Sequence, residues 1–105
     1  MYGLSEKTIK SIQEVFKKYL QVEKVILYGS RAKGNFRNGS DIDLVLVGGK
    51  LTLSDQFKIE TELDDLLLPY KIDLALYHQI ENADLIEHIG RVGVVFRENA
   101  NANGD

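Results

Sequence analysis

Three apolar runs divide the chain and predict its strands. They are Val25–Tyr28, Leu44–Val47 and Lys71–Tyr77. The first two are rich in Val, Ile and Leu and are bounded by Gly or Ser, as is typical of buried strands. The 23 residues between Val47 and Lys71 look mostly helical. A crossover of that length can join parallel neighbours, so we predict an α/β fold with a small mixed sheet packed by helices.

Apolar residues at helical spacing predict the remaining elements. The expected helices start at Ser5, Ser54 and Asn82, and the second of them stops before Pro69. The run Val94–Phe96 is expected to form a short edge strand. We predict one domain over residues 1–97 and a polar, disordered tail over residues 98–105.

A carboxylate pair opens the second strand-like run. Asp41 and Asp43 are separated by Ile42, and alternate residues of a strand face the same side. Two like charges on one face repel each other, so one of them would ordinarily take up a proton. A hard divalent cation removes that repulsion, because magnesium prefers carboxylate and phosphate oxygens. The pair therefore predicts a magnesium site.

A turn of small residues follows the first strand-like run. Gly29 permits torsions and close approaches that a side chain would forbid, and Ser30 offers a hydroxyl. The next three residues lack Pro and can form a short helix whose first N–H groups suit a phosphate. We predict that Gly29, Ser30, Arg31 and Lys33 bind a nucleotide. The sequence leaves open which of the cations, Arg37 included, face it.

A third acid lies near the start of the third strand-like run. If the second and third runs are parallel neighbours in similar register, Asp73 lies beside Asp41 and Asp43. Three acids around two magnesium ions would activate an attacking oxygen and hold the leaving phosphate. We therefore predict catalytic and metal-binding roles for Asp41, Asp43 and Asp73.

Together these motifs resemble the DNA polymerase beta-type nucleotidyltransferase superfamily. Gly-Ser-Arg-Ala-Lys-Gly at residues 29–34, then Ser-Asp-Ile-Asp-Leu at residues 40–44 and a later strand acid, are similar to its minimal nucleotidyltransferase (MNT) branch. The resemblance extends from the first helix to about Arg97. It implies the polymerase beta-like fold, nucleotide contact by Gly29 and Ser30, metal ligation by Asp41 and Asp43, and a ligand or base role for Asp73.

Composition narrows the function class further. The chain has 105 residues, a net charge of -3 and no cysteine, so it offers no disulfide framework and no thiolate zinc site. No apolar run approaches the roughly 20 residues that span a bilayer, and the N-terminus lacks the pattern of a signal peptide. We expect a cytoplasmic protein. The acidic balance argues against nucleic-acid binding, which usually requires a basic surface.

The resemblance also implies a partner. MNT proteins of this size are typically paired with a helical HEPN-domain protein, often as antitoxin and toxin, and can adenylylate a tyrosine of that partner. We therefore expect AMP transfer from ATP to a tyrosine of a HEPN-type toxin, which neutralises the toxin. Two alternatives stay open: a small-molecule adenylyltransferase, and a non-enzymatic antitoxin or binding subunit.

Three side chains outside these motifs remain. Phe36, in the polar loop of residues 34–39, either contacts the partner or folds back onto the domain. His78 and His88 are interpreted as surface or helix-end residues, because no partner ligands surround them in sequence.

Overall fold

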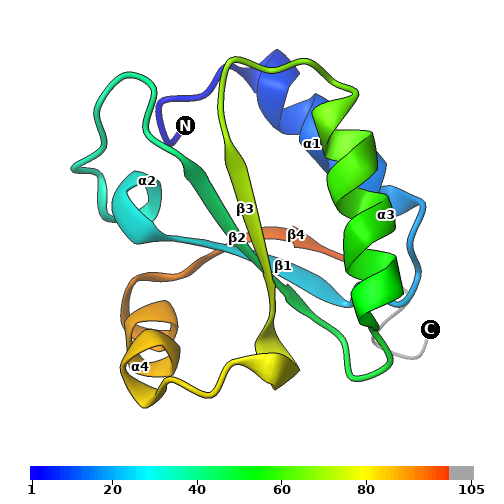
Figure 1. The fold of residues 1–105 in the computed structure, drawn as a ribbon. Coiled ribbons are helices and arrows are strands. Elements are labelled where there is room, and N and C mark those ends of the chain that lie inside the picture. The colour runs from blue at the N-terminus through cyan, green and yellow to red at the C-terminus, as the bar shows by residue number, and fades with distance from the viewer. Residues whose placement is uncertain (100–105) are drawn as a thin grey trace.

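The computed structural model describes residues 1–99, and it contains a four-stranded mixed sheet flanked by helices (Figure 1). The elements in chain order are α1 (Glu6–Lys17), β1 (Lys24–Tyr28), α2 (Gly29–Lys33), β2 (Ile42–Val47), α3 (Leu53–Asp64), β3 (Ile72–Leu76), the 3₁₀ turn η1 (Tyr77–Gln79), α4 (Ala83–Val92) and β4 (Val94–Glu98). The strand order is β3-β2-β1-β4. β1 pairs antiparallel with β2 and β4, whereas β2 and β3 are parallel. The predicted α/β class and the parallel crossover are confirmed.

Polar side chains cap the three long helices and set where they begin. Ser5 accepts a hydrogen bond from the Thr8 amide, and Asn82 accepts from the first turn of α4. Thr52 and Asp55 form a reciprocal capping box at the start of α3. α3 therefore begins earlier than the predicted Ser54 and ends at Asp64, well before Pro69. Each such cap contributes about 1 kcal/mol.

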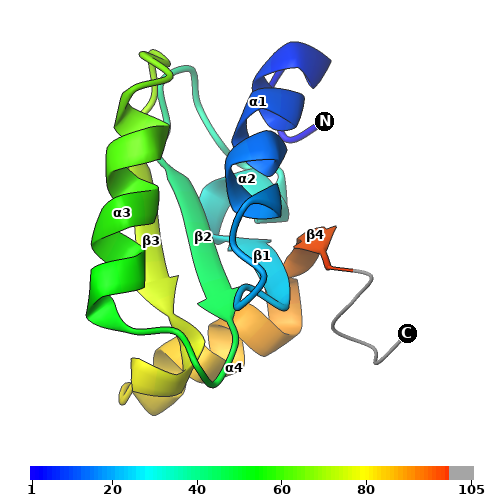
Figure 2. The same cartoon turned by 90° about the vertical axis from the view of Figure 1, so that its right-hand side faces the viewer.

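The hydrophobic core lies between the sheet and the helices α1 and α3. Alternate residues of β1 and β2 face these helices, as the pleat of a strand requires. The fully buried members are Ile12, Phe16, Val25, Leu27, Ile42, Leu44, Leu46 and Ile59. Figure 1 shows α1 and α3 on one side of the sheet and α2 and α4 on the other. Figures 1 and 2 both place α4 on the part of the molecule away from α1.

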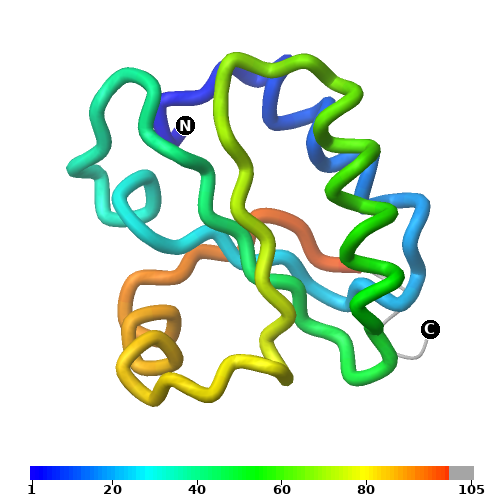
Figure 3. Tube along the Cα trace, viewed as in Figure 1, coloured from blue at the N-terminus to red at the C-terminus, as the bar shows by residue number. Residues whose placement is uncertain are grey.

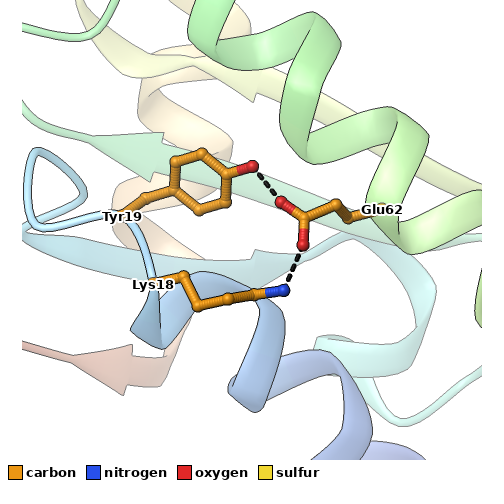
Figure 4. Close-up of polar contacts among 3 residues, drawn as sticks. All are labelled: Lys18, Tyr19 and Glu62. Atoms are coloured by element: carbon orange, nitrogen blue, oxygen red, sulfur yellow. Dashed lines mark hydrogen bonds and ion pairs between the residues drawn. The ribbon is translucent and has the colours of Figure 1, made fainter.

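A polar cluster joins the end of α1 to α3 at the rim of this core. The Glu62 carboxylate accepts hydrogen bonds from the Lys18 ammonium and the Tyr19 hydroxyl (Figure 4). This contact holds the Tyr19 proton and raises the pKa of Tyr19 to about 12. The same two donors lower the pKa of Glu62. The cluster therefore favours an ionised Glu62 and a protonated Tyr19.

β4 forms one edge of the sheet, as predicted for the run Val94–Phe96, but it is longer. Glu98 pairs with Lys24, and the Asn99 amide donates to the Glu23 carbonyl at 2.9 Å. The predicted tail therefore does not begin at residue 98, and its remainder, residues 100–105, lies outside the described residues. None of the helices in the described part of the chain is long and apolar enough to cross a membrane.

Candidate active site

Three polar side chains form a row across the sheet on the face opposite the core. The register pairs Tyr28 of β1 with Asp43 of β2, and Asp43 with Asp73 of β3. Directly paired residues of neighbouring strands have their side chains on the same face. The expected placement of Asp73 beside Asp43 is therefore confirmed. Asp41 precedes β2 and is exposed, and the amide of the next residue, Ile42, donates to the Lys71 carbonyl.

The Asp43 carboxyl lies in an environment that opposes its negative charge. Partial burial raises its pKa, and the charges of Asp73 and Asp41 and a hydrogen bond shared with Asp73 raise it further. The pKa of Tyr28 is raised too, by burial and then by the charges of Asp43 and Asp73. Lys71 lies 3.5 Å from Asp73 but is 72% exposed, so solvent screens this pair. The row is thus a site of uncompensated negative charge.

The Gly29–Ser30 turn lies against this row. Gly29 opens α2 with φ of 74°, a conformation that favours glycine, and a β-carbon there would collide with the Asp43 carboxylate. The Ser30 carbonyl accepts from the Gly34 and Asn35 amides. Within residues 1–99 the Ser30 hydroxyl makes no hydrogen bond, so it does not simply tie the turn to its own backbone. The turn brings a backbone and a hydroxyl next to the acids.

His88 of α4 also belongs to this site, which the sequence interpretation missed. Its Nε2 accepts a hydrogen bond from the Gly29 amide at 3.3 Å, and its ring packs edge-on against Tyr28. Only in its protonated form would His88 lower the pKa of the Asp43 carboxyl. The signal in the sequence was helical spacing, because His88 lies one turn beyond Leu85 and one turn before Val92.

Arg31 is part of the scaffold rather than a free phosphate ligand. Its guanidinium is 2% exposed, donates twice to the Ser40 carbonyl at 3.1 and 2.8 Å, and donates to the Tyr2 carbonyl at 2.8 Å. It also lies over the rings of Phe36 and Tyr70, 5.3 and 4.9 Å from their centroids. Its donors are therefore used internally, and the predicted nucleotide contact by Arg31 finds no support.

The N-terminal segment and the loop after α2 lie side by side around this arginine (Figure 3). Phe36 is half-buried, and a β-carbon on Gly3 would collide with its ring, so Phe36 folds back onto the domain. Of the two alternatives for Phe36, these contacts favour the one in which the ring folds back onto the domain. Lys33 and Arg37 are exposed.

A cavity of about 330 Å³ lies beside Asp73, between α3 and the chain that leads into β3. Polar side chains in its lining include Glu60, Asp64 and Lys71, and Tyr70 closes part of the wall. Within residues 1–99, no three His, Cys, Asp or Glu side chains are already gathered into a group that could hold a metal ion. The predicted metal roles of Asp41, Asp43 and Asp73 therefore stay predictions.

The sequence matches one protein family over most of its length. The family described as Polymerase beta, Nucleotidyltransferase matches residues 10–101. The sequence has no match among curated proteins.

Several solved structures of similar fold are toxin–antitoxin structures. A toxin–antitoxin structure with AMP-PNP has a TM-score of 0.71 at 16% identity, with 91% of this chain and 77% of that chain covered. A tri-AMPylated Shewanella oneidensis HEPN toxin in complex with MNT antitoxin has a TM-score of 0.68 at 14% identity, with coverage of 96% and 78%. An MntA-HepT structure has a TM-score of 0.67 at 14% identity, with coverage of 95% and 78%. At these identities the likeness shows the fold alone.

Proposed function

The chain belongs to the polymerase beta nucleotidyltransferase family, and from this premise we propose that it transfers AMP from ATP to a tyrosine hydroxyl of a helical protein partner. The observation that carries the proposal is the register of the sheet. It pairs Asp43 with Asp73. Gly29 lies against Asp43, and no residue with a β-carbon could take its place without a collision with the Asp43 carboxylate. Such an arrangement leaves negative charge unpaired, which costs stability unless a ligand compensates it.

Magnesium is the group whose chemistry fits these residues. Asp43 and Asp73 supply adjacent carboxylates, Asp41 lies just before β2, and the pKa of Asp43 is raised by its burial and its acidic neighbours. Magnesium usually combines one or two carboxylates with phosphate oxygens rather than a complete protein cage, so the two paired acids suffice for the protein's share. When bound, magnesium would supply positive charge that offsets the acids and the triphosphate.

Residues of the Gly-Ser turn and α2 then position the triphosphate. Gly29 allows the triphosphate to approach the acids, and the free Ser30 hydroxyl donates to a phosphate oxygen. Lys33, exposed at the end of α2, adds positive charge near the phosphates. These positions match the Gly-Ser element of the family.

Asp73 is the residue best placed to receive the acceptor's proton. It is 42% exposed and borders the 330 Å³ cavity, so a hydroxyl can approach it from the side away from Asp43. The acceptor oxygen attacks the α-phosphorus, the bond to the β-phosphate oxygen breaks, and pyrophosphate leaves. The proton of the hydroxyl passes to Asp73.

The nature of the acceptor rests on the neighbours in fold. One of them is an MNT antitoxin in complex with an AMPylated HEPN toxin, and another holds AMP-PNP. Each of these structures matches at least 91% of the length of this chain. We therefore assign this chain the antitoxin role, in which modification of a partner tyrosine neutralises the toxin.

The test is intact-mass analysis of the chain purified together with the product of the neighbouring gene, which we expect to be a HEPN-type protein. Incubation with ATP and magnesium is expected to add the mass of AMP to the partner. Asp43→Asn should abolish the gain, whereas Glu62→Gln, the same chemical change at a distance from the site, should leave it intact. A complex that forms without any mass gain would favour a non-enzymatic antitoxin. Modification of a free small-molecule hydroxyl instead would overturn the protein acceptor.

A further inference from the structure

The backbone amide of Gly29, in the turn where the proposed function places the triphosphate, already has an acceptor inside the protein. The Gly29 N–H donates to Nε2 of His88 at 3.3 Å. An imidazole nitrogen that accepts a hydrogen bond carries no proton, so the ring proton of His88 is on Nδ1. In the protein without nucleotide, His88 therefore occupies the acceptor position at the head of the Gly-Ser turn.

The imidazole is held in that position by its own packing. His88 is half-buried on the ten-residue helix α4, whose start is capped by Asn82. Its ring lies edge-on to Tyr28, with centroids 6.2 Å apart and planes at 82°. Tyr28 in turn is the cross-strand neighbour of Asp43. The contact with Gly29 thus links α4 directly to the acidic row.

We propose that His88 is a positioning residue of the nucleotide site, which holds the Gly29 amide in the free protein and yields it to a phosphate oxygen of the triphosphate. An amide has one hydrogen, so two acceptors compete for it. The inference rests on the proposed function, because it takes the Gly29 turn to be the phosphate site. It goes beyond that function by assigning α4 a part in nucleotide affinity.

A triphosphate can displace His88 from the Gly29 amide, whereas a ligand without charged oxygens cannot. A charged phosphate oxygen forms a shorter and stronger bond with an amide than a neutral imidazole does. The ligand must nevertheless offset the loss of the His88 contact before it gains affinity. Adenosine has no phosphate and leaves that contact in place, so His88 affects the affinity for ATP and not the affinity for adenosine.

The test compares two substitutions by titration calorimetry with ATP and with adenosine. His88→Phe keeps a ring against Tyr28 but removes the acceptor, and we expect ATP to bind about fivefold more tightly, equivalent to about 1 kcal/mol, with adenosine unchanged. His88→Gln restores an acceptor at a similar distance from the backbone and should restore the wild-type affinity. His78→Phe, at an exposed histidine of η1, is the matched control and should change nothing.

A measurement on the unaltered protein keeps the proposal testable if a variant fails to fold. Saturating ATP should move the ¹⁵N resonance of His88 Nε2, because that atom loses its donor. An Nε2 resonance that stays in place, or a His88→Phe protein that binds ATP equally or more weakly, overturns the inference. A wild-type protein that binds no ATP overturns the proposed function, and this inference with it.

Discussion

Two carboxyl clusters of this protein are built in opposite ways. Glu62 joins α3 to the end of α1, accepts hydrogen bonds from Lys18 and Tyr19, and has a lowered pKa. Asp43 faces Asp73 across a strand pair, with Asp41 close by, and has a raised pKa. The first carboxyl is stabilised as an anion by the protein itself. The second is destabilised as an anion by its burial and by the charges of Asp73 and Asp41.

This difference separates a structural contact from a candidate functional one. The Glu62 cluster connects two helices and its members satisfy each other, so it can be explained by stability alone. The Asp43 row costs stability, and only an external cation or ligand would offset that cost. Substitutions in the Asp43 row should therefore lower activity without lowering stability, and substitutions in the Glu62 cluster should lower stability without lowering activity.

The largest expected effect is on transfer by Asp43→Asn. We expect the rate of AMP transfer to fall by about a hundredfold or more, because the substitution removes an acid from the centre of the site. In the metal-free protein at neutral pH the same variant should be at least as stable as wild type, because it relieves like-charge repulsion. Transfer assays and urea unfolding measure the two effects. A variant that is fully active, or one that is inactive only because it is unfolded, would break the contrast.

Arg31 extends the comparison to a buried cation that the protein satisfies internally. Arg31→Ala should lower the free energy of unfolding by about 3 kcal/mol, because it removes three hydrogen bonds and the contacts with two aromatic rings. Arg37→Ala is the control, since Arg37 is exposed and its side chain should contribute little. Denaturant titration of both variants gives the answer. If Arg31→Ala and Arg37→Ala are equally stable, Arg31 is again a candidate ligand of the nucleotide.

A smaller loss of stability is expected from Tyr19→Phe in the other cluster. Removing the hydroxyl takes away one hydrogen bond to Glu62, so the free energy of unfolding should fall by less than in Arg31→Ala, while transfer activity stays at the wild-type level. In wild type, absorbance of the phenolate should show a tyrosine that titrates near pH 12. An absorbance titration in which no tyrosine ionises near pH 12 would contradict the hydrogen bond between Tyr19 and Glu62. A loss of transfer activity in a folded Tyr19→Phe would contradict the structural role.

The smallest expected effect is a pair of opposite slopes of stability with pH in the acid range. The raised pKa of Asp43 means that it keeps its proton to higher pH in the folded state than in the unfolded state. Its contribution to the free energy of unfolding therefore falls as the pH rises above the ordinary pKa of an aspartate. The lowered pKa of Glu62 means that it loses its proton at lower pH in the folded state than in the unfolded state. Its contribution to the free energy of unfolding is therefore present above the ordinary pKa of a glutamate and is lost as the pH falls. Urea unfolding at several pH values should show stability that rises more steeply with pH in Asp43→Asn than in wild type. Glu62→Gln should rise less steeply, and identical slopes in all three proteins would refute these assignments.

Local patterns were enough to predict most of the secondary structure and the position of Asp73. The apolar runs marked all four strands, with Val94–Phe96 as the short edge strand. The length of the crossover implied the parallel pair that brings Asp73 beside Asp43. Helix ends were less accurate, because Thr52 competes with Ser54 as a cap and wins through its reciprocal bond with Asp55. Such competition depends on side-chain geometry that a residue pattern does not contain.

The errors at the site concern contacts between segments distant in sequence. Arg31 looked like a phosphate ligand because it follows Gly29 and Ser30, but its partners include Tyr2 and Tyr70, which only the folded chain brings near. His88 looked isolated because its partner Gly29 is 59 residues away. Long side chains find such partners in three dimensions, so neighbouring residues in the sequence gave no sign of them.

Titration calorimetry with ATP, in magnesium and in chelator, tests most directly whether the acidic row is a site for nucleotide and metal. We expect binding to be at least about tenfold tighter with magnesium, because the charges of Asp43 and Asp73 otherwise oppose the phosphates. Asp43→Asn should lose most of this dependence, whereas Glu62→Gln should retain it. Equal affinity for ATP with and without magnesium in the wild-type protein would contradict this function for the row.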